Sequence, residues 1–207
     1  LVVTVVTVAV PVLTLNISES VMRFALDKDA DKQKITQIGT GVLLIGMLVG
    51  LLVFPICRSF DKISQYSLYV YLYVIASAAS QMYLCDLRGK ELLVYYSIGN
   101  VLNTLFIACF NILFLLVFKE GIRGYLKAYI IANTLTAIYA IIIGKGYKSL
   151  HFSHIDKGLL TRMAKYSVVL IPNSFMWWIM NSSDRIMVSS MVSVAANGIY
   201  AVSYKLP

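Results

Sequence analysis

Five long apolar runs constrain this chain more than any other feature of its sequence. They cover roughly residues 1–26, 34–57, 63–85, 91–118 and 122–144, and a further apolar stretch begins near residue 163. A helix needs about 20 apolar residues to cross a bilayer, and each run is long enough. The runs are continuous rather than alternating, which argues against a transmembrane β-barrel. We therefore predict an all-α fold, a polytopic transmembrane helix bundle.

The composition supports a membrane protein and disfavours other classes. Hydrophobic residues make up 59% of the chain and charged residues 14%. The formal net charge of +8 could indicate nucleic-acid binding, but the basic residues are dispersed among hairpins. Cys57, Cys85 and Cys109 are widely spaced and indicate free packing residues, and His151 and His154 indicate a solvated connection. We expect no metal, no cofactor and no nucleic-acid partner.

The basic residues also favour one orientation in the membrane. Simple alternation places the connections 27–34, 86–90 and 145–165 on one side and the hairpins near 58–62 and 119–127 on the other. The first side carries eleven of the 18 basic residues, namely Arg23, Lys28, Lys32, Lys34, Arg88, Lys90, Lys145, Lys148, Lys157, Arg162 and Lys165. The second side carries five, namely Arg58, Lys62, Lys119, Arg123 and Lys127. The positive-inside rule makes the first side cytoplasmic.

Polar side chains share one face on several of the predicted helices. Tyr66, Tyr69 and Tyr73 align on the run 63–85, together with two serines, and Asn100 and Asn103 align on the run 91–118. Unpaired polar groups are costly in lipid. One such stripe is ordinary helix packing, but stripes on consecutive helices favour a shared polar cavity.

Glu19 and Arg23 stand four residues apart near the inner end of the first run. This spacing allows the two side chains to meet on a helix. The pair is either a stabilising interfacial contact or the charged floor of a cavity for anionic head groups.

The stretch from 162 to 207 allows two interpretations. Either an external turn occupies Asn181 to Arg185, or one helix runs from about 163 to 192, bends at Pro172 and turns at 193–198. The second interpretation gives the helix a polar face formed by Arg162, Asn173, Trp177 and Asp184, with Asn181 beside it. A charged side chain costs on the order of 2.5 to 3.5 kcal/mol at bilayer depth. In the turn interpretation Asp184 and Arg185 are simply exposed to water, whereas in the single-helix interpretation they need a polar interior.

Two regions of the sequence carry a resemblance to a known family. One includes Ile171-Pro172-Asn173-Ser174, Trp177-Trp178-Ile179-Met180-Asn181-Ser182-Ser183-Asp184-Arg185 and Ala195-Ala196-Asn197-Gly198-Ile199-Tyr200; the other is Ile17-Ser18-Glu19-Ser20-Val21-Met22-Arg23-Phe24. They resemble the polysaccharide (O-antigen) flippases of the multidrug/oligosaccharidyl-lipid/polysaccharide exporter superfamily, whose members have two lobes of about six helices. On that mapping the chain is a fragment: 1–144 holds helices two to six of the first lobe without helix one, 145–161 is a cytoplasmic interfacial connection, and 162–207 begins the second lobe with helix seven and the start of helix eight.

The resemblance implies a transporter and not an enzyme. Such a protein moves a lipid-linked oligosaccharide on a polyprenyl diphosphate carrier across the bacterial plasma membrane by alternating access. Membrane lipids, a polysaccharide polymerase and glycosyltransferases are the other partners it implies. The alternatives are a cation-coupled multidrug exporter of the same superfamily, which would favour acidic cavity residues, and an integral-membrane glycosyl or acyl transferase, which would need a catalytic constellation.

The resemblance and the polar faces together suggest roles for particular residues. Arginines match diphosphate oxygens and would bind the head group, and these are Arg23, Arg162 and Arg185. Glu19 and Asp184 would hold these arginines between substrates or couple ion movement. The side chains expected to face sugar are Tyr66, Tyr69, Tyr73, Trp177, Asn100, Asn103, Asn173 and Asn181. Pro172 would be a hinge.

Overall fold

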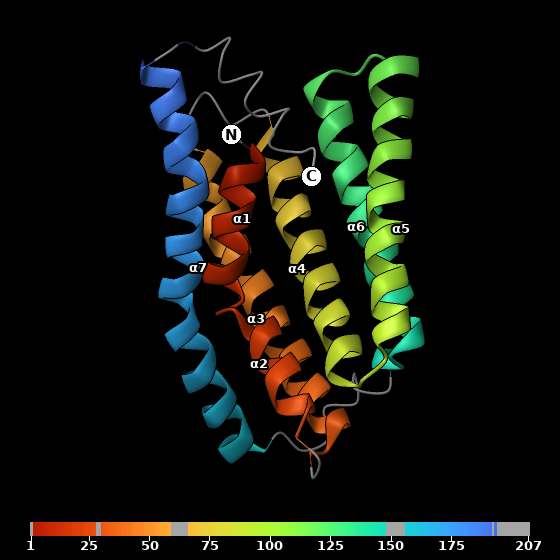
Figure 1. Cartoon of the computed structure of the whole chain (residues 1–207), viewed down its shortest axis with the longest axis vertical. Helices are drawn as coiled ribbons and strands as arrows, with labels where there is room; N and C mark the ends of the chain where they lie inside the picture. The colour runs from red at the N-terminus through yellow and green to blue at the C-terminus, as the bar shows by residue number, and fades with distance from the viewer. Residues whose placement is uncertain (1, 28–29, 59–65, 148–155, 192, 194–207) are drawn as a thin grey trace.

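The computed structural model is arranged around one central helix, α4 (Ser67–Gly89), which packs on α2, α3 and α6 (Figure 1). The structure describes residues 2–27, 30–58, 66–147, 156–191 and 193. The other elements are α1 (Val2–Leu13), α2 (Ile17–Ala25), α3 (Lys32–Arg58), α5 (Leu93–Asn111), the π-helix η2 (Ile112–Val117), α6 (Ile122–Ile143) and α7 (Lys157–Met191). In Figure 1, α7 forms one edge of the bundle and α5 the opposite edge. No strand occurs in the described ranges, and the predicted all-α fold is confirmed.

Four described segments are long and apolar enough to cross a membrane: Lys32–Leu52, Ser67–Gly89, Leu93–Val117 and Ile122–Ile143. The outward face of α5 and η2 is typical of contact with lipid, since Val94 on α5 is 70% exposed and Leu116 on η2 is 69% exposed. The helix α7 is long, at about 50 Å for its 35 residues, but amides and hydroxyls interrupt its apolar sequence. The chain is therefore a multi-pass membrane bundle.

The prediction of one continuous helix over residues 1–26 is wrong, because the run is broken between α1 and α2. Leu15 and Asn16 have left-handed backbones, with φ of 50° and 54°. The Asn16 N–H donates to the Pro11 carbonyl at 2.8 Å, and the Leu15 N–H donates to the Val12 carbonyl at 3.4 Å. These two bonds form the Schellman pattern, which satisfies the last carbonyls of a helix. The break can therefore lie inside a membrane bundle without exposing these two carbonyls to lipid.

A glycine on α3 allows that helix to pack directly on the break. Leu13 is the last residue of α1, and a Cβ atom added at Gly46 would clash with its carbonyl oxygen. Beside it, the Thr14 hydroxyl turns back to donate to the Val10 carbonyl at 2.7 Å. The break is thus held between its own hydrogen bonds and the bare backbone of α3.

The connections lie at the ends that alternation predicts. Figure 1 shows the α2–α3 and α4–α5 connections and the start of α7 at one end of the bundle, with the η2–α6 connection at the other. The helix α7 begins at Lys157, so the last residues of the predicted interfacial connection are helical. Of the rest of that connection, the structure describes residues 145–147 and Asp156. His151 and His154 lie outside the described residues.

The helix α7 runs without interruption to Met191 and passes through Asn181 to Arg185. The prediction of one helix through Asn181 to Arg185 is therefore confirmed, and the alternative of an external turn there is wrong. The bend at Pro172 stays a prediction. Of the turn predicted at 193–198, only Ser193 is described.

Candidate functional site

The helix α7 joins the rest of the bundle along a polar seam with α1 and α2. The Ser20 hydroxyl donates to the Met163 carbonyl at 2.7 Å, and the Asn16 side-chain amide donates to the Ser174 hydroxyl at 3.2 Å. The Ser167 hydroxyl reaches the Asn16 carbonyl at 3.5 Å. Met163 and Ser167 are fully buried. The seam therefore fixes which face of α7 meets the first helices.

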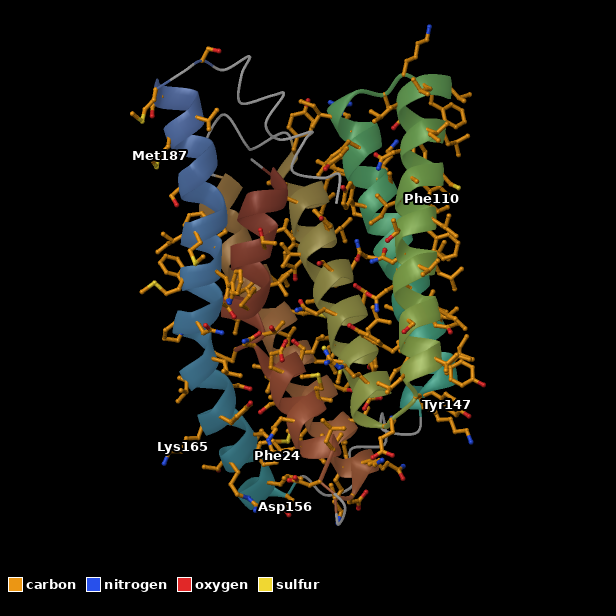
Figure 2. The ribbon with its side chains drawn as sticks, viewed as in Figure 1. Phe24, Phe110, Tyr147, Asp156, Lys165 and Met187 are labelled. Carbon is orange, nitrogen blue, oxygen red and sulfur yellow. The ribbon has the colours of Figure 1, made fainter. Side chains whose placement is uncertain are left out.

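A second face of α7 carries the predicted polar residues and stays open. Arg162 and Asn173 are exposed, and Trp177 is 60% exposed. At about 100° per residue, these three lie within about 60° of one another, and the centre of this arc is about 90° from that of the seam residues Met163 and Ser167. Trp177 lies nearest to the seam. Figure 2 shows the length of this helix between Lys165 and Met187. The side chains of Asn181, Asp184 and Arg185 lie outside the described residues, although their backbone is part of α7.

Arg23 lies on α2 near the same end of the bundle as the start of α7. Its guanidinium pairs with Asp27 at 3.0 Å rather than with Glu19, the partner that the sequence spacing suggests. Both members of the observed pair are more than half exposed. Next to Arg23, the Phe24 ring (labelled in Figure 2) meets the Tyr166 ring edge-on, with the ring centroids 6.0 Å apart, and this contact connects α2 to α7.

The tyrosine stripe of α4 packs against α6. Tyr73 is buried, and its ring lies 5.2 Å from the ring of Tyr129. Further along the same face, the Ser80 hydroxyl donates to the side-chain oxygen of Asn133 at 2.9 Å. Helix packing therefore accounts for the buried part of this stripe. Tyr66 and Tyr69, at the N-terminal end of α4, are only half-buried.

The amides of α5 are separated from the polar face of α7. Asn100 is exposed and donates to the Tyr96 carbonyl of its own helix at 2.9 Å. Asn103 is half-buried, and its side-chain oxygen has no hydrogen-bond partner within the described part of the chain. Because α5 and α7 occupy opposite edges of the bundle in Figure 1, the structure does not bring the two predicted groups together.

A buried ionic cluster at the end of the bundle that holds the α4–α5 connection was missed from the sequence. Asp86 was assigned to a connection, but it lies within α4 and is 1% exposed. Its carboxylate accepts from Lys90 at 2.6 Å and from the Thr36 hydroxyl, and Lys90 also donates to the Gly144 carbonyl at 2.8 Å. The four-residue spacing of Asp86 and Lys90 was the available signal. No group of metal-binding side chains occurs among the residues described.

A small cavity lies between α1 and α7. Its volume of about 20 Å³ suits about one water molecule and is far too small for a sugar. The lining residues are Thr7, Pro11, Val12, Ile171, Ser174 and Phe175. The open face of α7, and not this cavity, is therefore the candidate substrate surface.

Comparison with known proteins gives one family match. A family model described as polysaccharide biosynthesis protein matches residues 1–206. No curated protein and no solved structure matches the chain. The match includes both the broken first run and α7, so it spans every element that forms the seam and the open face.

Proposed function

The chain belongs to the polysaccharide biosynthesis protein family, and we propose that it moves a lipid-linked oligosaccharide across the bacterial plasma membrane. The carrier would be a polyprenyl diphosphate, and the mechanism alternating access between two lobes. No bond is made or broken in this process. The lipid tail stays in the bilayer while the charged and sugar portions follow a polar path through the protein.

The open face of α7 is the observation that carries this proposal. Asn173 and Trp177 lie about 16 Å and 22 Å along the helix from Arg162, so the face extends over much of the membrane depth. An arginine and an amide facing hydrocarbon would be costly, which means that this face needs water or polar neighbours. A polar path along α7 meets that need.

The residue types on this face suit the parts of the substrate. A guanidinium presents a planar fork that binds diphosphate oxygens, which is the role we propose for Arg162, Arg23 and Arg185. Trp177 and Asn173 offer a ring and an amide to sugar, and Asn181 continues that face. The exposed Arg23–Asp27 pair is weakly held, so a diphosphate can displace Asp27.

Other residues in the proposal are assigned supporting roles. Glu19 and Asp184 would hold the arginines between substrates or couple ion movement, and Pro172 would absorb bending of α7. Tyr66 and Tyr69 are half-buried near the outer end and could still meet sugar there. The buried Tyr73 contributes through packing.

The test replaces Arg162 with alanine in the intact protein in its native host. We expect surface polysaccharide to fall and lipid-linked precursor to accumulate, each by about tenfold or more, because a charge-assisted hydrogen bond contributes about 1.5 to 3 kcal/mol. Arg162→Lys should be intermediate, since lysine keeps the charge without the fork. Arg123→Ala, an exposed change on α6 at the other end of the bundle, is the matched control.

Normal export at normal protein level in Arg162→Ala would remove Arg162 from the substrate path. If the purified, reconstituted protein instead elongated or modified the glycan, the transferase alternative would replace the transporter. Export of cationic drugs without an effect on polysaccharide would favour the multidrug alternative.

A further inference from the structure

We propose that α5 carries an interaction surface for a further transmembrane helix, one that presents amide or hydroxyl side chains at helical spacing. The residues of this surface, which we call the amide face, are Ser97, Asn100, Thr104 and Asn111. The amide face is separate from the polar face of α7 and from the transport that we propose for that face.

The helix α5 has three sides that differ in what covers them. One side packs on the bundle, where a Cβ atom added at Gly99 would meet Leu84 of α4 and Tyr139 of α6. A second side is exposed and apolar, and its residues include Val94, Val101 and Leu105. At about 100° per residue, the amide face is centred about a quarter turn from the apolar side and about a third of a turn from Gly99. The amide face is therefore neither the packed side nor the lipid side.

The amides of α5 form few hydrogen bonds within the described part of the chain. Asn100 donates to the Tyr96 carbonyl at 2.9 Å, and Thr104 donates to the Asn100 carbonyl at 3.1 Å. Both bonds stay within α5, and no described residue donates to the side-chain oxygen of Asn100. The side-chain oxygens of Asn103 and Asn111 also accept no hydrogen bond from described residues. Because an unpaired amide is costly in lipid, the amide face needs a polar neighbour.

The spacing and depth of the amide face fit a helix as that neighbour. Its four residues are separated by 3, 4 and 7 positions, which is the heptad spacing of two helices that pack side by side. The face extends about 21 Å along α5 and lies inside the apolar span Leu93–Val117. Helix interfaces in bilayers are enriched in serine and threonine, and asparagine hydrogen-bonds across them. Amides and hydroxyls both donate and accept, so the matching helix carries side chains of the same kinds.

The position of α5 disfavours lipid and glycan as occupants. Figure 1 places α5 at the edge of the bundle opposite α7. Lipid tails offer no hydrogen bonds to an amide. A glycan on this edge would have the bilayer on its other side, where its hydroxyls would stay unpaired. A transmembrane helix satisfies its own backbone and can bring polar side chains to the contact.

Photo-cross-linking of the intact protein in its native membrane identifies the occupant. One variant is Thr104→benzoylphenylalanine, which carries a photoreactive ring on the amide face. The matched control is Leu105→benzoylphenylalanine, which carries the same ring on the apolar side at nearly the same depth. We expect the Thr104 variant to cross-link to a peptide from a transmembrane segment that carries serine, threonine, asparagine or glutamine at spacings of three or four. The Leu105 variant should form lipid adducts only.

Mass spectrometry of the cross-linked peptide distinguishes the outcomes. A cross-link to α5 of a second molecule, recognised by mixing isotope-labelled and unlabelled protein, would support the proposal and identify the helix as a second copy. A cross-link to another polar transmembrane segment would support it and identify that segment. Lipid adducts alone at position 104, a glycan adduct, or a peptide from a water-soluble domain would overturn it.

Leucine substitutions test whether the amides hold the partner helix. Asn100→Leu and Asn111→Leu should each lower the cross-linking yield at position 104 by about threefold, as expected for one interhelical hydrogen bond in a membrane. Val101→Leu introduces the same residue on the apolar side and should leave the yield unchanged. Protein level and size-exclusion profile show that each variant is folded. An unchanged or higher yield in both asparagine variants would overturn the proposal, because leucine would then serve the contact as well as the amide does.

Discussion

The ammonium of Lys90 lies 2.6 Å from the carboxylate of Asp86, one turn earlier on the same helix, and 2.8 Å from the Gly144 carbonyl at the end of α6. The Thr36 hydroxyl of α3 donates to the same carboxylate. One buried ion pair therefore connects α3, α4 and α6 at one end of the bundle. A buried acid with a complete set of partners makes a testable contribution to stability.

Removing one member of this pair should be strongly destabilising. We expect Lys90→Met to lower the free energy of unfolding by about 3 to 5 kcal/mol, because Asp86 is left as an unpaired buried charge. The double variant Lys90→Met with Asp86→Asn should recover part of the loss. Thermal unfolding of the purified protein measures both effects. The control is Lys34→Met, which breaks an exposed pair with Asp31 and should cost about 1 kcal/mol or less; equal losses at the two sites would contradict the prediction.

The left-handed Leu15 should respond to substitution in opposite directions. Leu15→Gly should raise the midpoint of thermal unfolding, because glycine adopts a positive φ without the penalty of about 1 to 2 kcal/mol that other residues incur. Leu15→Val should lower it, since a β-branched side chain is least compatible with this conformation. Leu15 is 41% exposed, so both variants lose only part of a packed side chain and the backbone effect decides the sign. Destabilisation by glycine as large as that by valine would indicate that a regular helix forms here.

Gly46 should tolerate no side chain. Gly46→Ala is expected to destabilise the protein by about 1 to 3 kcal/mol, because the added methyl group meets the backbone of Leu13, which cannot rotate away. Gly50→Ala, one turn further along α3, meets only the ends of the Tyr71 and Leu13 side chains and should cost less. Unfolding in mild detergent compares the two variants. The packing of α3 on the break would be wrong if Gly50→Ala were the more damaging change.

The orientation predicted from the basic residues can be measured by labelling. In a cysteine-free background, Glu91→Cys places a thiol in the α4–α5 connection, and Lys119→Cys places one in the η2–α6 connection at the other end of the bundle. A membrane-impermeant maleimide added to intact cells should label only Lys119→Cys. Permeabilised cells should label both. Labelling of only Glu91→Cys in intact cells would reverse the topology.

Apolar length and periodicity were enough to predict most of the helices. The runs 34–57, 63–85, 91–118 and 122–144 correspond to α3, α4, α5 with η2, and α6, because an uninterrupted apolar run in a membrane has few alternatives to a helix. The same reasoning failed for residues 1–26. Pro11 and Asn16 are the local signals of a break, but a proline and an asparagine also occur at 172–173, where α7 continues. Packing against Gly46 and α7 distinguishes the two places, and the sequence alone does not show this packing.

The candidate site was predictable only in part for a related reason. A helical wheel shows that Tyr73 and Ser80 share a face, but it does not show which neighbour that face meets. The neighbour is α6, where Tyr129 and Asn133 lie opposite them. On α7, the wheel grouped Arg162, Asn173 and Trp177 on one face, and all three side chains are exposed in the structure.

The break at Leu15 and Asn16 also constrains the order in which the protein is made. Its stabilising partner Ser174 is 158 residues further along the chain, so it is synthesised long after the first run has entered the membrane. The break's own hydrogen bonds and the packing of α3 at Gly46 are available much earlier. We therefore expect the bend to form when α3 enters the membrane, and its contact with α7 to be the late step of biogenesis that marks a mature protein.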